Sequence, residues 1–379
     1  MKHLRALAVS LLAAAACSKP APDAPAATDE LVFGEVSSLT GQEATFGSST
    51  HNAIMLAVNE LNSMGGVNGK KIRVVTYDDQ GKPTEAAAAT TKLIVQDKVH
   101  VILGEVASSR SLAMAPIAQS NGVPMISPSS TNPKVTLDKD FVFRVCFIDP
   151  FQGSVMAKYA TQDLKLSRFA VLRDVRNDYS VGLSDVFSAS VTGFGARVAI
   201  DQSYSAGDID FKSQLTAIKA ASPEAIYVPG YYTDVALIAR QARELGITVP
   251  LMGGDGWDSE KLFEIGGDAL EGSYFSNHYA PEDPNPRIQK FVTDYKAAYG
   301  STPDALAALG YDAAMVAAAA AGRAKSLSGA DLREAIAQTV QHPGVTGTIT
   351  LGPDRNAVKP AVVLRITARK AGYVATVNP

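Results

Sequence analysis

Hydroxyl side chains crowd one short stretch, "MISPSSTNP" (125–133), where an apolar pair runs into Ser127, Ser129, Ser130 and Thr131. A hydroxyl both donates and accepts hydrogen bonds, so such a cluster can bind a carboxylate. The same residue types also form turns and helix caps. The spacing alone leaves both interpretations open.

A second stretch, "LMGGDGW" (251–257), places Asp255 between glycines and just before Trp257. An aspartate between glycines is commonly a turn residue, but its carboxylate can also pair with an ammonium group. Upstream, "YVPGYY" supplies Tyr231 and Tyr232, and these aromatic rings suit an apolar group. Packing in the core is the alternative for the aromatic residues.

A helix is expected to begin in the loop of Ala107, Ser108 and Ser109, within "GEVASSRS". The first N–H groups of a helix have no partner within it and attract anions, although these serines could simply cap the helix. The hydroxyl-rich stretch and the loop 107–109 therefore suit a carboxylate, and the region around Asp255 suits an ammonium and an apolar group. Together they predict a site for a zwitterionic amino acid.

These candidate residues follow strands in an alternating β/α pattern. Short β-rich runs alternate with amphipathic helical segments, which predicts parallel sheets covered by helices on both faces. The pattern restarts after about residue 149, so we expect two Rossmann-like α/β lobes. The predicted strands are 31–36, 71–77, 99–103, 124–127, 168–174, 197–204, 224–230 and 249–254.

The two units have matching internal spacing. Gly104 to Pro124 spans the same number of residues as Gly230 to Pro250, and a candidate residue stands five positions past each proline. In open parallel sheets, ligands bind beyond the carboxyl ends of the strands, which is where these positions fall. The match indicates two copies of one supersecondary unit, although ordinary βαβ construction would produce it as well.

The sequence has few features that indicate nucleic-acid binding, catalysis, metal binding or a membrane span. The net charge of −3 offers no basic surface for nucleic acid. The sequence has neither a Gly-x-Ser-x-Gly nucleophile elbow nor a Walker A loop, and its five histidines lack metal-ligand spacing. We therefore expect no cofactor, no metal and no enzymatic activity. The apolar run 313–322 is short and flanked by charges, so it predicts a packed helix rather than a membrane span.

The N-terminus has the pattern of a signal peptide, residues 1–16, in which Lys2 and Arg5 precede a short apolar run. Two cleavage sites compete: ordinary processing after the alanines, and lipoprotein processing with acylation of Cys17. We favour lipidation, although Ala14 stands where the lipoprotein pattern usually has leucine. The Pro/Ala-rich segment 17–29 would then tether the protein to a membrane.

An ordered series of motifs makes the chain resemble the type I periplasmic solute-binding proteins of the branched-chain amino acid (leucine/isoleucine/valine-binding) family, which serve ABC transporters. The motifs are "SLTGQEATFG", "GGVNGKKIRVVTYDDQGKP", "GEVASS", "ISPSSTNP", "DYSVG", "YVPGYYTDVALIARQAREL" and "LMGGDGW". The resemblance implies two lobes joined by three crossovers near Asp149, Asn277–Tyr279 and Gly344–Thr346. The implied lobes are 30–148 plus 279–345 and 149–278 plus 346–379.

Residue roles follow from the same resemblance. Ser108 and Thr131 would bind the ligand's carboxylate, while Asp255, Thr131 and the Ser129 carbonyl would meet its ammonium. Many relatives have glutamate at the Asp255 position. The aromatic positions of the family correspond to Phe46, Tyr179 and Tyr231. Trp257 replaces a small residue, which leaves the preferred ligand side chain open.

We therefore expect a periplasmic, monomeric protein, anchored through Cys17, that closes on an apolar amino acid and delivers it to an ABC permease. It would contact the membrane only through the lipid and would bind no nucleic acid. The alternatives are a binder of amides, urea or small aromatic acids, and a ligand sensor with the same fold. A hydrolase would need a base beside a serine, and the sequence places no histidine near either loop.

Overall fold

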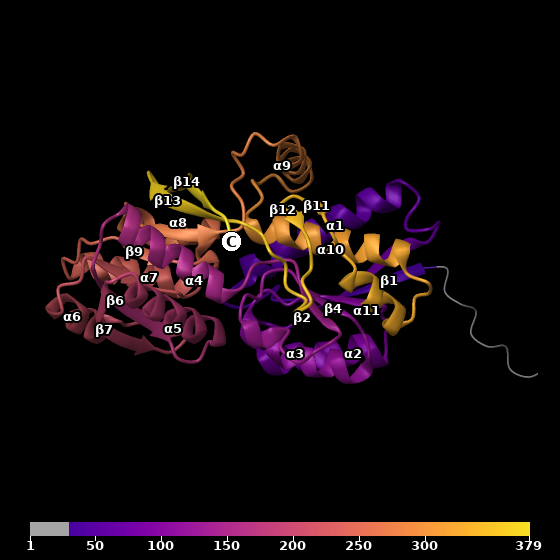
Figure 1. Ribbon diagram of the computed structural model, residues 1–379, viewed down its shortest axis with the longest axis horizontal. Helices are drawn as coiled ribbons and strands as arrows, with labels where there is room; N and C mark the ends of the chain where they lie inside the picture. The colour runs from indigo at the N-terminus through magenta and orange to yellow at the C-terminus, as the bar shows by residue number, and fades with distance from the viewer. Residues whose placement is uncertain (1–29) are drawn as a thin grey trace, which may run out of the picture.

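The computed structural model describes residues 30–379. The predicted signal peptide, Cys17 and the linker to residue 29 lie outside the described residues. The chain forms two α/β halves side by side, each built on its own sheet (Figure 1). The predicted fold class, with parallel sheets flanked by helices, is confirmed.

The sheet of the first half has five parallel strands in the order β2-β1-β3-β4-β5. Gly34 of β1 pairs with Val75 on one side and Ile102 on the other, so β1 is an interior strand, and it is almost completely buried. The strands are β1 (Glu30–Ser37), β2 (Lys71–Asp78), β3 (Val101–Leu103), β4 (Met125–Ser127) and β5 (Val142–Arg144).

The sheet of the second half has the order β14-β13-β10-β9-β8-β6-β7. Its strands are β6 (Arg168–Asp174), β7 (Arg197–Tyr204), β8 (Ala225–Tyr227), β9 (Leu251–Gly253), β10 (Tyr274–Asn277), β13 (Ala361–Thr367) and β14 (Lys370–Val377). β13 and β14 run antiparallel, an edge that the sequence analysis did not predict. A separate hairpin consists of β11 (His342–Gly344) and β12 (Gly347–Ile349).

Helices cover both sheets, and some of them have a capping residue at one end. Asn177 caps α5 by accepting the N–H of Tyr179, and Gly122 ends α3 in the left-handed conformation. The helices are α1 (Ala44–Ser63), α2 (Pro83–Val95), α3 (Ser108–Asn121), α4 (Asp149–Lys158), α5 (Asp178–Gly193), α6 (Lys212–Ala220), α7 (Tyr232–Glu244), α8 (Glu260–Gly266), α9 (Pro286–Tyr299), α10 (Ala305–Arg323) and α11 (Gly329–Ala337).

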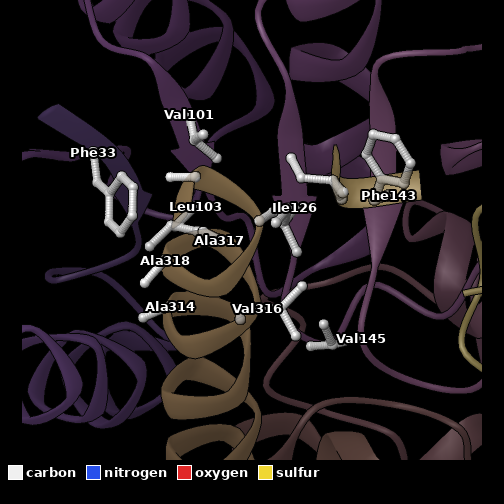
Figure 2. Packing of buried hydrophobic residues seen from close by; sticks show 14 of the residues in the cluster. Phe33, Val101, Leu103, Ile126, Phe143, Val145, Ala314, Val316, Ala317 and Ala318 are labelled. Atoms are coloured by element: carbon white, nitrogen blue, oxygen red, sulfur yellow. The ribbon is translucent and has the colours of Figure 1, made fainter. Parts of the chain in front are cut away.

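The alanine-rich helix α10 is the core helix of the first half, which confirms the prediction of a packed helix. Figure 2 shows Ala314, Val316 and Ala317 of α10 lying among side chains of the sheet such as Leu103 and Ile126. By length and composition α10 could cross a membrane, but 78% of the apolar stretch is buried inside the protein. Small side chains instead let it approach α1 and the sheet closely.

The chain passes between the halves after β5, after β10 and before β13. Ile349, Leu351 and Ala357 pack in the core of the first half. We therefore propose that the third crossover lies between Ala357 and β13, later than the boundary at 345/346 implied by the family resemblance.

The start of α1 packs tightly against the loop after β1, and this contact predicts a stability effect. A Cβ on Gly47 would lie 2.0 Å from the Ser38 carbonyl oxygen. Gly47→Ala should therefore lower the free energy of unfolding by about 1–3 kcal/mol, because a backbone clash must be relieved by movement. Urea denaturation measures the change.

Gly193→Ala is the matched control, since Gly193 also lies in a helix but a Cβ there would meet no atom within 4 Å. It should leave stability unchanged or raise it by less than about 1 kcal/mol. Equal effects of the two substitutions would contradict the close approach at Gly47.

Candidate functional site

A small cavity lies where strand ends and helix starts of the two halves meet. Its empty volume of about 240 Å³ includes space that is open to solvent, and the enclosed part is small. The lining residues are Phe46, Val106, Ser108, Ser129 and Leu306 from the first half, and Tyr179, Tyr231, Asp255 and Gly256 from the second. Six of the predicted site residues are among them.

The hydroxyl-rich stretch after β4 mostly connects one loop to another. Ser127 Oγ donates to the Glu105 carbonyl at 2.7 Å, and Ser130 Oγ donates to the Val106 carbonyl at 3.0 Å. Ser129 Oγ also donates to the Val106 carbonyl, at 3.2 Å. These three hydroxyls therefore hold the loop after β4 against the loop after β3, a structural role that differs from the turn and helix-cap roles considered from the sequence.

Thr131 differs from its neighbours because its buried Oγ1 lies beside the Asp149 carboxyl and does not bond to the neighbouring loop, and the residue does not line the cavity. Ser108 is the first residue of α3, and its Oγ accepts the Asn132 N–H at 3.2 Å. The start of α3 presents N–H groups that the helix itself cannot satisfy, which suits a carboxylate.

Asp255 is the central charged group of the cavity. It begins the turn Asp255–Trp257 directly after β9 and is 4% exposed. Its Oδ1 accepts hydrogen bonds from Gln152 Nε2 at 2.7 Å and from the Tyr179 hydroxyl at 3.0 Å. Its Oδ2 lies 2.9 Å from His278 Nε2.

Within residues 30–379, no lysine or arginine forms an ion pair with Asp255. Burial lowers the pKa of His278 below its ordinary value, so this ring is neutral at pH 7. The carboxylate is therefore hydrogen-bonded but lacks a compensating positive charge. A ligand ammonium would supply that charge.

Aromatic rings form the apolar wall of the cavity. Tyr179 stacks on Tyr231 with ring centroids 5.4 Å apart, and Phe46 meets Tyr231 edge-on at 5.5 Å. Since Phe46 belongs to the first half and Tyr231 to the second, this contact closes the cavity between them. With Val106 and Leu306, these rings suit an apolar ligand side chain.

Besides Thr131, two further predicted site residues lie outside the cavity. Trp257 is completely buried in the core of the second half, where its Nε1 donates to the Val228 carbonyl at 2.9 Å. A Cβ on Gly253 would lie 2.2 Å from the indole, so glycine makes room for the ring. Ala107 lines a second, wider and more polar cavity that also touches Tyr231.

Gln152, His278 and Leu306 belong to the site, but the sequence analysis missed them. His278 could have been predicted as a site residue, because it directly follows the carboxyl end of strand β10. Gln152 and Leu306 lie on helices without a distinguishing pattern.

Hydrogen bonds join the two halves around the cavity. Ser109 Oγ donates to Asp178 Oδ2 at 2.9 Å, and the Tyr232 hydroxyl donates to the Gln42 carbonyl at 2.8 Å. A further contact links the hydroxyls of Thr45 and Ser259 at 2.9 Å. The halves are therefore in a closed arrangement.

Two α/β halves closed over a small cavity at their strand ends define a cleft-type solute-binding protein. Residues 30–372 match the family model described as periplasmic binding protein. The chain belongs to this family, whose name implies an extracytoplasmic location.

Named relatives bind amino acids according to their descriptions. The chain is 30% identical to the Leu/Ile/Val-binding protein BraC3 of Rhizobium johnstonii over 87% of this chain and 89% of the relative. A leucine-binding protein structure from Thermotoga maritima is 43% identical, with a TM-score of 0.89, covering 92% of this chain and 99% of that one. A solute-binding protein from R. palustris in complex with benzoate is 25% identical, with a TM-score of 0.83, over 92% and 97% of the two chains.

Asp149, at the start of α4, predicts a pH-dependent stability. The residue is completely buried, and the Thr131 hydroxyl lies beside its carboxyl group. Burial raises the pKa of Asp149 to about 8. Because the pKa in the folded state exceeds the unfolded value, the protonated form favours folding, and this contribution is lost as pH rises from about 4 to about 8.

Asp149→Asn should therefore reduce the pH dependence of stability across that window and raise stability relative to the wild type at pH 8. Titration of Asp149 lowers the wild type's free energy of unfolding by up to about 1.4 kcal/mol per pH unit, since a shift of one pKa unit corresponds to that free energy. Urea unfolding of both proteins between pH 5 and pH 8 measures the difference. Parallel curves would contradict the raised pKa.

Proposed function

We propose that this protein captures an apolar α-amino acid, of the leucine, isoleucine and valine type, in the cavity between its halves and delivers it to an ABC permease. The buried Asp255 carboxylate without a compensating cation is the observation that carries the proposal. The apolar wall of the cavity and the descriptions of the relatives also support it.

In this proposal, the two halves bind opposite poles of the ligand. The ammonium pairs with Asp255 of the second half, and the carboxylate meets Ser108 at the start of α3 in the first half. Removing one partner of a buried, hydrogen-bonded charge pair costs about 3–5 kcal/mol. A helix terminus contributes about 0.3–2 kcal/mol to binding an anion. The ammonium contact therefore dominates the polar recognition.

Closure follows from this division of the site. In an open form each half holds only part of the site, so a ligand that bridges both favours the closed form. The contacts Ser109–Asp178, Tyr232–Gln42 and Thr45–Ser259 would form as the halves meet. Exclusion of water then strengthens the pairing at Asp255.

A small aromatic acid is the second candidate ligand. The stacked rings of Tyr179 and Tyr231 favour it, as does the neighbour solved with benzoate. Benzoate has no ammonium, however, and would leave the Asp255 charge uncompensated. Amino acids therefore fit the site better.

We further propose a monomer that is anchored through acylated Cys17 and works from the periplasm. The apolar run before Cys17 and the Pro/Ala-rich linker after it support this anchor. Mass spectrometry of the protein extracted from membranes should detect the lipid on Cys17, and an unmodified N-terminus would contradict it.

A thermal-shift screen of the mature protein tests the ligand class. Leucine, isoleucine and valine should raise the melting temperature, since a ligand at a hundred times its Kd stabilises by about 2.7 kcal/mol. Benzoate and simple amides should have a smaller effect. A shift with benzoate and none with any amino acid would overturn the proposal in favour of the second candidate.

Asp255→Asn tests the central contact while keeping the shape of the side chain. Affinity for leucine, measured by calorimetry, should fall about 100-fold or more, because the ammonium loses its charged partner. Asp268→Asn is the control, since Asp268 is exposed and pairs with Arg369 at the surface. Unchanged leucine affinity in Asp255→Asn would contradict the proposed role.

A further inference from the structure

His278 lies between the site and the crossovers that join the halves. It directly follows β10, and its side chain is fully buried. The imidazole stacks on the Phe147 ring with centroids 3.8 Å apart and planes at 21°, and Phe147 lies just before α4 in the first crossover. One face of the imidazole is thereby fixed, and its Nε2 points at Asp255 Oδ2.

The surroundings of the ring decide where its proton lies. Nδ1 is buried without a hydrogen-bond partner. A proton on Nδ1 would leave a buried N–H unpaired, which is costly, whereas a proton on Nε2 can be donated to Asp255 at 2.9 Å. The geometry therefore selects the neutral ring with the proton on Nε2.

The Asp255 carboxylate has a limited number of acceptor positions, and its neighbours occupy most of them. An ionised carboxylate offers about two lone-pair positions on each oxygen. Gln152 and Tyr179 occupy both positions on Asp255 Oδ1. His278 occupies one position on Oδ2, so a single acceptor position remains, on the oxygen that His278 contacts.

We propose that His278 is a positioning residue that fixes Asp255 with one Oδ2 lone pair free for the ligand's ammonium, and so makes the amino group a requirement for binding. This inference rests on the proposed function and names the residue that gives the site its selectivity. A neutral imidazole orients the carboxylate without cancelling its charge. A fixed cation at the same position would compensate Asp255 and remove the advantage of an ammonium-bearing ligand.

The test compares variants at His278 with two ligands, L-leucine and 4-methylpentanoate, the same molecule without its amino group. Calorimetry on the wild type should give far tighter binding of leucine. His278→Phe keeps a ring against Phe147 but cannot donate, and it should weaken leucine binding about 10- to 100-fold while leaving 4-methylpentanoate binding unchanged. His278→Gln, whose Nε2 can still donate, should stay within about threefold of the wild type for leucine.

His51→Phe is the matched control, because His51 pairs with Glu35 away from the cavity and should leave both affinities unchanged. A second measurement needs no variant: nitrogen NMR of the wild type should show His278 neutral at pH 7 with its proton on Nε2. A charged ring, or a proton on Nδ1, would overturn the inference even if the variants fail to fold.

The outcomes separate this inference from the proposed function. If the wild type binds leucine and His278→Phe binds it equally well, the positioning role is wrong and the proposed function stands. If the wild type binds no amino acid, the proposed function is wrong. An equal loss of both ligands in His278→Phe would indicate a merely structural role and would also overturn the inference.

Discussion

A buried negative charge without a positive partner is the constraint around which the site is organised. Asp255 lies almost completely out of water and accepts hydrogen bonds from three neutral groups, Gln152, Tyr179 and His278. Hydrogen bonds make burial of the carboxylate tolerable but leave its charge unneutralised. The carboxylate would therefore stabilise a small cationic group that enters the cavity.

The rest of the architecture serves to bring groups from distant parts of the chain to this charge. Parallel strands place their carboxyl ends on the same side of each sheet, and residues that follow strands of both sheets line one cavity. His278 reaches Asp255 from one crossover and is stacked on Phe147 from another. His278 therefore contacts both the site and the first crossover, so a movement of the crossovers would change the position of the Asp255 carboxylate.

Several features could be predicted because they depend on local pattern. Alternating β-rich and amphipathic segments indicated the α/β halves, and the position after a strand indicated Ser108, Ser129 and Asp255 as cavity residues. The antiparallel edge of β13 and β14 escaped prediction, because pairing direction depends on the partner strand rather than on the strand's own residues. For Trp257 the sequence left core packing and ligand contact open, and the space beside Gly253 that the indole fills in the core depends on the tertiary structure.

The sequence by itself determined the element order, the helix starts and the types of polar group available at the strand ends, because these depend on residues near each other in the chain. Only the tertiary structure decided which hydroxyls are already used, since Ser127 and Ser130 find their acceptors in another loop while Thr131 Oγ1 lies beside the Asp149 carboxyl. It also decided that His278, rather than a lysine or arginine, stands beside Asp255. Hydrogen-bond satisfaction and charge compensation act through space, and no spacing along the chain encodes them.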